Sequence, residues 1–211
     1  GAFDYDHPIR LTGAKLREVS FSPTDLETRL EAATSPRVAG VVFVWKNRND
    51  GELIRRIADF CRTKSLPFIL DGAMGLPPEE NLRGFQALGP NLIAISGGKH
   101  LGAPQNSGLL FGDEPLVKSA WLQMVDMDVR AASWSRAQWL DDGFVSRPPR
   151  HGIGRAMKVG KDAILGCLTA VQLYAQRDFA AEREKWSWLC HEIIKQSRLS
   201  PNFEFEYLEK N

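Results

Sequence analysis

Strand-like and helix-like segments alternate through the first half of this chain, and the alternation restricts the fold more than any other feature. Residues 38–45 form a continuous apolar run rich in β-branched side chains, which is typical of a strand buried on both faces. Residues 53–61 then place apolar side chains at helical spacing, and residues 66–70 form a second strand-like run. A strand, a helix and a strand of these lengths predict a right-handed crossover and a mostly parallel sheet.

Further elements extend the pattern to both sides of this unit. We predict additional strands at 15–19, 91–95, 109–111 and 203–207, and additional helices at 23–33, 77–88, 155–176 and 179–197. Ser22 is expected to cap the helix at 23–33, with Pro23 at its first position. Residues 121–150 hold three tryptophans but little periodicity, so we expect an ordered excursion there. The fold class is therefore α/β, with a mostly parallel sheet flanked by helices and long helices near the C-terminus.

Charge and cysteine usage exclude several classes of protein. The 27 Lys and Arg residues against 26 Asp and Glu leave a net charge of +1, which argues against a protein that coats a polyanion. The three cysteines, Cys61, Cys167 and Cys190, lie far apart among apolar helical neighbours, which predicts buried thiols in a reducing compartment and hence the cytoplasm. Without a CxxC or HExxH motif, we expect no metal site. No secretion signal or membrane-spanning apolar run is visible, so no membrane partner is expected.

The strongest chemical signal lies where the predicted strands end. Ligands of parallel α/β sheets bind beyond the carboxyl ends of the strands, and Asp71 and Ser96 each follow a predicted strand. A glycine-rich loop then runs from Ser96 to Gly108 and carries Lys99. A nucleotide P-loop is excluded, because the motif needs Gly and Ser or Thr where this sequence has Ile93 and His100.

A partly buried lysine in such a loop suits covalent chemistry with a carbonyl compound, since its amine can form a Schiff base. Pyridoxal 5′-phosphate (PLP) would need a carboxylate at its ring nitrogen, a hydroxyl at its phosphate and a small residue against its ring. Asp71, Ser96 and Ala73 are candidates for these three supports. On this motif alone, a solvated turn remains the alternative.

Five segments of the chain resemble the bacterial selenocysteine synthase family, that is, L-seryl-tRNA(Sec) selenium transferase and its non-tRNA relatives. These segments are 70–73, 76–82, 95–99, 102–105 and 152–161, and they occur in the same order as in that family. The family has the aspartate-aminotransferase fold (fold type I) and uses PLP. The resemblance therefore implies this fold and this cofactor.

The resemblance also implies a role for each matched cofactor residue. Lys99 would hold the cofactor as a Schiff base and, once released by substrate, would move the substrate proton. Asp71 would pair with the pyridinium nitrogen. Ser96 would hydrogen-bond the phosphate, and Ala73 would pack on the ring.

Other residues are candidates at the rim of this site. Gln105, Asn106 and Ser107 would lie near the phosphate, either of the same subunit or of a dimer partner. His100, Arg155 and Lys158 are candidates for contact with the substrate. For His100, the equal alternative is a loop histidine that only makes hydrogen bonds within the loop. For Arg155 and Lys158, the equal alternative is a position on the solvated surface.

The resemblance implies a division of the chain as well. Residues 1–150 would be a PLP-binding large domain that lacks its N-terminal part, and residues 151–198 would be interdomain helices. Residues 199–211 would begin a truncated small C-terminal domain. A homodimer or a higher homo-oligomer is expected.

The predicted function is that of a PLP-dependent lyase or transferase. Its substrate would be an amino acid or an amino sugar, and its reaction α,β-elimination or β-replacement. Two alternatives stay open: a PLP-dependent aminotransferase, and an inactive truncated domain that dimerises. The near-neutral charge argues weakly against tRNA as the substrate, because a further domain could bind it.

Overall fold

The computed structural model describes residues 6–20, 22–46, 50–124, 130–136, 138–147 and 151–197. The chain divides into two compact units, residues 1–170 and 171–211. The predicted strand at 203–207 and the predicted start of a small domain at 199–211 lie outside the described residues.

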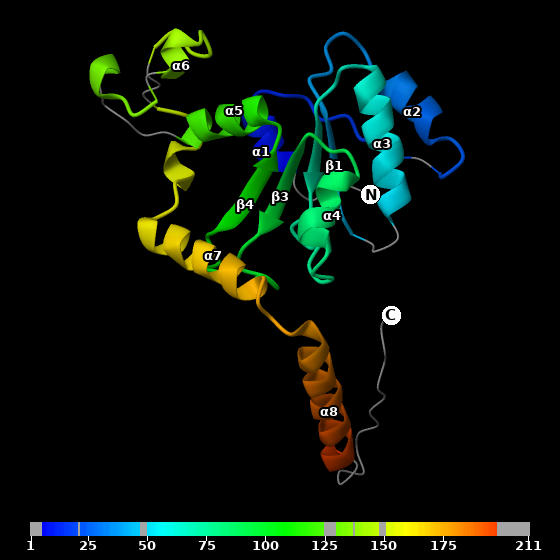
Figure 1. The fold of residues 1–211 in the computed structure, drawn as a ribbon. Helices are drawn as coiled ribbons and strands as arrows, with labels where there is room; N and C mark the ends of the chain where they lie inside the picture. The colour runs from blue at the N-terminus through cyan, green and yellow to red at the C-terminus, as the bar shows by residue number, and fades with distance from the viewer. Residues whose placement is uncertain are drawn as a thin grey trace. The chain divides into compact units, whose positions relative to one another are not determined.

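A four-stranded sheet forms the centre of the first unit (Figure 1). Its strands lie side by side in sequence order: β1 (Val41–Val44), β2 (Phe68–Asp71), β3 (Leu92–Ser96) and β4 (Gly108–Gly112). The first three strands are parallel, and β4 pairs with β3 in the antiparallel direction. The predicted α/β class with a mostly parallel sheet is therefore confirmed.

Helices connect and follow these strands. They are α1 (Asp6–Leu11), α2 (Leu26–Ala33), α3 (Gly51–Thr63), α4 (Asn81–Ala87), α5 (Glu114–Met124), α6 (Gln138–Asp141), α7 (Lys161–Tyr174) and α8 (Phe179–Ser197), with 3₁₀ turns η2 (Ala131–Ser133) and η3 (Arg155–Met157). The crossovers of the parallel strands run through α3 and α4, as predicted. The long helices near the C-terminus are confirmed by α7 and α8. The predicted bounds 155–176 are wrong, because residues 155–157 form the separate turn η3 and the helix begins at Lys161.

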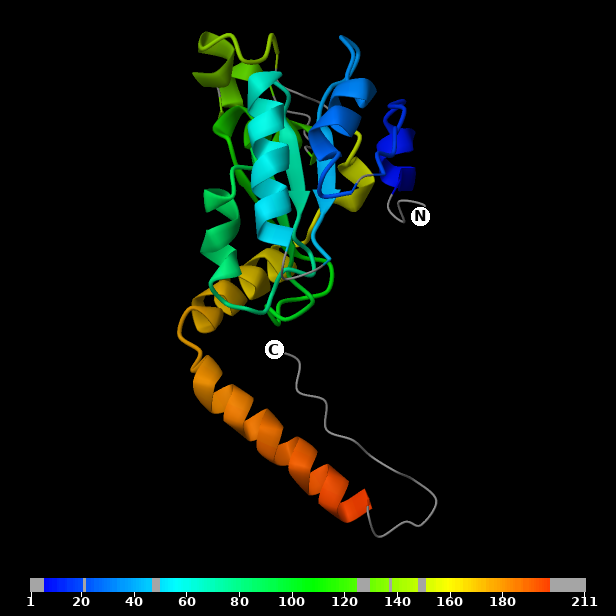
Figure 2. The same cartoon turned by 90° about the vertical axis from the view of Figure 1, so that its right-hand side faces the viewer.

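One face of the sheet is the core of the first unit. Alternate residues of a strand point to opposite faces, and on this face Phe68, Leu70, Ile93 and Ile95 are at most 3% exposed. The helix α3 packs against β2 and also against α2, and Figure 2 shows α2 and α3 side by side. The apolar stripe of α3 includes Ile54 and is buried, so these helices keep water from this face.

The opposite face of the sheet is less covered among the described residues. Val42 is 37% exposed and Leu110 is 41% exposed, and both lie on this face by the strand register. The prediction that strand 38–45 is buried on both faces is therefore wrong. The physical reason is that the described helices pack on the opposite face of the sheet and leave the Val42 side of β1 less covered.

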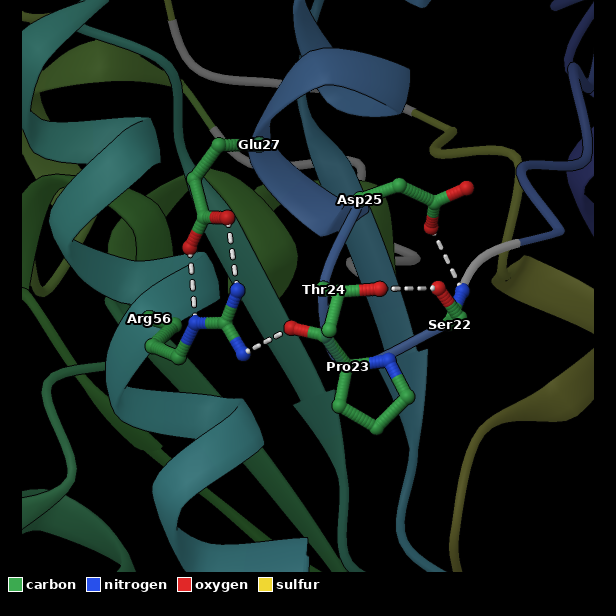
Figure 3. A network of polar contacts seen from close by, with 6 residues as sticks. All are labelled: Ser22, Pro23, Thr24, Asp25, Glu27 and Arg56. Carbon is green, nitrogen blue, oxygen red and sulfur yellow. Dashed lines mark hydrogen bonds and ion pairs between the residues drawn. The ribbon is translucent and has the colours of Figure 1, made fainter.

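Two local predictions near the N-terminus are also wrong. Residues 14–20 form no strand, and Arg17 instead donates a hydrogen bond of 3.2 Å to the Ala33 carbonyl at the end of α2. Ser22 does not cap α2, because the bond runs the other way: the Asp25 carboxylate accepts from the Ser22 amide at 2.6 Å (Figure 3). A turn at 23–25 precedes the helix, which begins at Leu26.

Aromatic packing joins the described part of the aperiodic segment, residues 130–136 and 138–147, to α5. Around the Trp139 ring lie the rings of Trp121, Trp134 and Phe144, with centroids 5.3, 6.0 and 5.8 Å away, all edge to face. Lys118 and Arg136 lie over these rings as cations. Large rings bury much apolar area without needing helical periodicity, which explains an ordered segment whose pattern predicts no single helix.

Candidate active site

The main predicted site residues meet at the carboxyl edge of the parallel strands. Asp71 ends β2 and Ser96 ends β3. Asp71 is the register partner of Ala94, which stands two residues before Ser96, so Asp71 and Ser96 lie on the same face of the sheet. Strand spacing and rise place their Cα atoms roughly 8 Å apart. This is the less covered face, where both residues are half-buried.

Asp71 opens a short turn, residues 71–75, which we call the acid turn. The carboxylate of Asp71 accepts a hydrogen bond of 2.9 Å from the Ala73 amide. The amide of Gly72 donates to the Ala94 carbonyl on β3 at 2.8 Å, so the turn stays attached to the neighbouring strand. Among the residues that the structure describes, Asp71 has no ion-pair partner, and its second oxygen stays available to a ligand.

Aromatic packing supports the acid turn from the core side. A Cβ on Gly75 would overlap the ring of Phe85, and a Cβ on Gly72 would lie 3.0 Å from that ring. Phe85 is fully buried on α4 and meets the ring of Trp45 edge to face, with centroids 4.8 Å apart. Glycine at both positions lets the turn sit directly on Phe85, which fixes its height above the core.

Lys99 lies in the turn that follows β3, and its side chain is exposed. The expected partial burial of this lysine is therefore wrong, because the two arms of its loop pack on each other rather than around its side chain. The turn is closed by its own backbone: the Gly102 amide donates to the Lys99 carbonyl at 3.0 Å, and the Ala103 amide donates to the Gly97 carbonyl at 2.9 Å. The Lys99 ammonium makes no hydrogen bond or ion pair with any part of the chain that the structure describes. The amine is thus presented on a fixed backbone and is available for reaction.

The glycines before Lys99 allow the two arms of its loop to touch. A Cβ on Gly97 would lie 2.7 Å from the Ser107 carbonyl oxygen, and a Cβ on Gly98 would lie 2.6 Å from the Cα of Gln105. The Ser107 hydroxyl donates to the Pro104 carbonyl at 2.7 Å, so it also holds the loop. The groups that approach these glycines closely are therefore those of the loop itself.

The first part of α7 packs against the returning arm of this loop. A Cβ on Gly166 would lie 2.8 Å from the Cγ of Pro104, and the Cys167 sulfur lies 3.9 Å from the Gly108 carbonyl oxygen. Figure 1 shows α7 beside this end of the sheet. Sequence reasoning missed Gly166 as a supporting residue. The small residues Ala163, Cys167 and Ala170 mark a buried stripe on the same helix, but the sequence alone does not show that this helix meets the Lys99 loop.

The three substrate candidates lie in two places. His100 is half-buried in the turn beside Lys99. Arg155 and Lys158 are exposed at η3, which packs against α5, where the Gly154 amide donates to the Gln123 carbonyl at 2.7 Å. These contacts do not bring Arg155 or Lys158 to the acid turn, and their role with substrate stays a prediction.

Neither a metal-binding cluster nor a membrane-spanning helix is found among the described residues. No group of three His, Cys, Asp or Glu side chains there is arranged to hold a metal ion. None of the helices in the same ranges combines the length and the apolar character that crossing a membrane requires.

Two curated proteins resemble the chain over most of its length. D-Glucosaminate-6-phosphate ammonia lyase of Salmonella typhimurium (strain 14028s / SGSC 2262) is 30% identical over 180 residues, which are 82% of this chain and 40% of that protein. The 5′-C-glycyluridine monooxygenase-decarboxylase of Streptomyces sp is 30% identical over 170 residues, which are 79% of this chain and 35% of that protein. Both relatives are enzymes, and the chain spans less than half the length of either.

The other comparisons add little. No protein-family model matches the chain. The solved SepCysS–SepCysE N-terminal domain complex matches with a TM-score of 0.45 and 13% identity, over 82% of this chain and 41% of that chain. A TM-score this low carries no argument, so the fold rests on the sheet topology. The two curated relatives support an enzyme, and neither is named a selenocysteine synthase, so that family remains a resemblance.

Proposed function

We propose that this chain forms the cofactor-binding core of a PLP-dependent lyase. The observation that carries the proposal is the arrangement of Asp71 and Ser96 on one face at the carboxyl edge of the sheet, with Lys99 in a closed turn three residues further on. The relative named as an ammonia lyase of an amino-sugar phosphate supports elimination over group transfer. We therefore propose a substrate that carries an amine and a phosphate or carboxylate.

The residues fit the chemical demands of PLP. One oxygen of Asp71 is held by the Ala73 amide, and the other is available to the protonated ring nitrogen. The spacing of roughly 8 Å between the Asp71 and Ser96 Cα atoms suits a group with a ring nitrogen at one end and a phosphate at the other. When bound, PLP supplies a ring that accepts electrons from the substrate carbon.

The proposed roles of the chain's own groups are those that the resemblance implies, and their positions support them. The Asp71 carboxylate would keep a proton on the ring nitrogen, the Ser96 hydroxyl would donate to the phosphate, and Ala73 would offer a small surface to the ring. The Lys99 amine would hold the cofactor and would then carry the proton removed from the substrate. Gln105 is exposed and is proposed to reach the phosphate of its own or a partner subunit.

Ser107 has a narrower proposed role. Its hydroxyl proton is already donated to the Pro104 carbonyl, and its own carbonyl accepts from the Gly97 amide at 2.9 Å. We assign Ser107 to holding the Lys99 loop closed. His100 is proposed to line the pocket, and Arg155 and Lys158 to attract the anionic group of the substrate.

The test is covalent labelling of the lysine. Titration of the protein with PLP should give a saturable visible absorption band, and borohydride should then fix the cofactor on Lys99. Lys99→Ala should abolish the label, whereas Lys161→Ala, a change at an exposed lysine on α7, should leave it. A label on another lysine, or no saturable band, would overturn the proposal.

A second measurement separates the lyase from an aminotransferase. A lyase should release ammonia from an amino-sugar phosphate without any added keto acid. A strict requirement for a keto acid as amine acceptor would show that the protein is an aminotransferase instead.

A further inference from the structure

We propose that Asn81 is a positioning residue that holds the acid turn in the geometry the cofactor site needs. The inference rests on the proposed function and goes beyond it, because Asn81 itself contacts neither Asp71 nor Lys99 in any hydrogen bond. Asn81 is the first residue of α4 and is half-buried. Its side-chain amide donates a hydrogen bond of 2.8 Å to the Gly75 carbonyl, at the far end of the acid turn.

The acid turn is tied at both ends by hydrogen bonds. At its start, the Gly72 amide donates to Ala94 on β3; inside it, the Gly75 amide donates to the Gly72 carbonyl, each at 2.8 Å. At its end, the bond from Asn81 is the tie to α4. The Ala73 amide, which orients the Asp71 carboxylate, lies between these ties. Losing the Asn81 bond would therefore free the end of the turn and loosen the amide that orients the acid.

The same helix face also supplies an apolar contact to this turn. Residues four apart on a helix lie one above the other, so Asn81 and Phe85 share a face of α4. Phe85 is fully buried beneath Gly75, and Asn81 bonds the Gly75 carbonyl at the edge of that contact. Phe85 thus sets the height of the turn and Asn81 its lateral position. Phe85 belongs to the core, so its loss would affect the whole fold, whereas Asn81 can be changed with a local effect.

The test compares Asn81→Ala with Gln86→Ala, which removes the same kind of amide from an exposed position of α4. Hydrogen exchange at the Ala73 amide reports the turn without any cofactor, and the PLP dissociation constant reports the site. Because one neutral hydrogen bond is lost, Asn81→Ala should speed exchange at Ala73 about five- to tenfold and raise the PLP dissociation constant by a similar factor. Gln86→Ala should change neither. Exchange at the Leu70 amide on β2, inside the core strand, is the internal reference for global opening.

Each outcome decides between the inference and the function on which it rests. If the unaltered protein gives no saturable PLP band, the proposed function fails, whatever the exchange data show. If it binds PLP and Asn81→Ala leaves both readouts unchanged, the positioning role is overturned and the function stands. If Asn81→Ala speeds exchange at Leu70 as much as at Ala73, Asn81 serves general stability and the inference is also overturned.

Discussion

The Asp71 carboxylate accepts a hydrogen bond of 2.9 Å from the Ala73 amide, so the acid that ends β2 is oriented by its own turn. Asp71→Asn keeps an oxygen that can accept this bond but removes the negative charge. We expect Asp71→Asn to fold with an unchanged melting temperature and to lose turnover by about 100-fold or more, since electrostatic stabilisation at the reacting group is lost. Thermal unfolding and kcat measure the two effects separately.

A second variant at this position tests the contribution of the hydrogen bond from the Ala73 amide to stability. Asp71→Ala removes the acceptor as well as the charge, so it should also reduce the free energy of unfolding by about 1 kcal/mol. An Asp71→Asn protein with full turnover would contradict the assigned role of the charge.

Gly98 should be intolerant of any side chain, because a Cβ there would lie 2.6 Å from the Cα of Gln105, a backbone atom that cannot swing away. Gly98→Ala is expected to cost about 1–3 kcal/mol of stability through overpacking and to weaken PLP binding by displacing Lys99. The matched control is Gly84→Ala on α4, where no atom lies within 4 Å of the added Cβ. That change should stabilise the protein by about 0.5–1 kcal/mol, because alanine is the better helix former. Urea unfolding of the two variants measures the loss of stability in Gly98→Ala and the gain in Gly84→Ala. Equal changes in the free energy of unfolding would refute the packing argument.

Strands and helices with strong periodicity were predictable from the sequence alone. The apolar run at 66–70 and the stripe at 53–61 correspond to β2 and α3, and the predicted helix at 179–197 has the bounds of α8. The weak points were short segments whose structure depends on partners. The short segment Lys15–Val19 pairs with no strand among the described residues, and Ser22 does not cap α2 because its amide donates to the Asp25 carboxylate.

The positions of the candidate residues at the ends of the strands were predictable, but the residues that support them were not. Asp71, Ser96 and Lys99 follow from strand ends and a glycine-rich loop, which are local features of the sequence. The roles of Phe85, Asn81 and Gly166 depend on which distant segments come into contact, and a single sequence does not record those contacts. The close approach of Gln105 to Gly98 also depends on a contact that the sequence does not record. The cofactor roles themselves stay predictions until labelling is done.

The three thiols should differ sharply in reactivity. Burial without a stabilising charge raises the pKa of the Cys61 thiol to about 11, and the thiolate is the reactive form. Cys167 is also buried, as predicted, whereas the prediction of a buried Cys190 is wrong, because this residue is exposed on α8. At neutral pH we expect a disulfide reagent such as DTNB to modify one thiol rapidly in the native protein and the others only after unfolding. Cys190→Ser should remove the fast phase, and a fast phase that survives this change would contradict the assignment.

The same burial predicts how alkaline pH affects stability. Because the folded-state pKa of Cys61 is raised, the folded protein keeps its thiol proton at pH values where the unfolded chain loses it. The Cys61 contribution is therefore fully present below pH 9.0 and is lost as pH rises towards about 11. Cys61→Ala should remove this part of the alkaline slope, at the cost of a small cavity; an unchanged slope in urea unfolding at these pH values would argue against it.

Arg56 on α3 makes three hydrogen bonds to α2 and to the turn that precedes it. Acidic pH should weaken this interaction selectively. Its guanidinium donates to both carboxylate oxygens of Glu27, at 2.7 and 2.6 Å, and to the Pro23 carbonyl at 2.7 Å (Figure 3). The hydrogen bond from Arg56 lowers the pKa of Glu27, so the pair's contribution is present above the ordinary glutamate range and is lost as pH falls through the lowered value.

Glu27→Gln should therefore lower the melting temperature modestly at neutral pH, since the Glu27 side chain is 51% exposed and the Arg56 side chain 28% exposed. The difference from the unaltered protein should shrink in concentrated salt and vanish at acid pH, where Glu27 is protonated in both states of the unaltered protein. Arg56→Lys should lose most of the same stability, because an ammonium cannot reach both oxygens and the Pro23 carbonyl with the fixed fork of a guanidinium. A difference that stayed constant from neutral to acid pH would show that the Glu27 charge plays no part, and that packing of the two helices alone holds α2 in place.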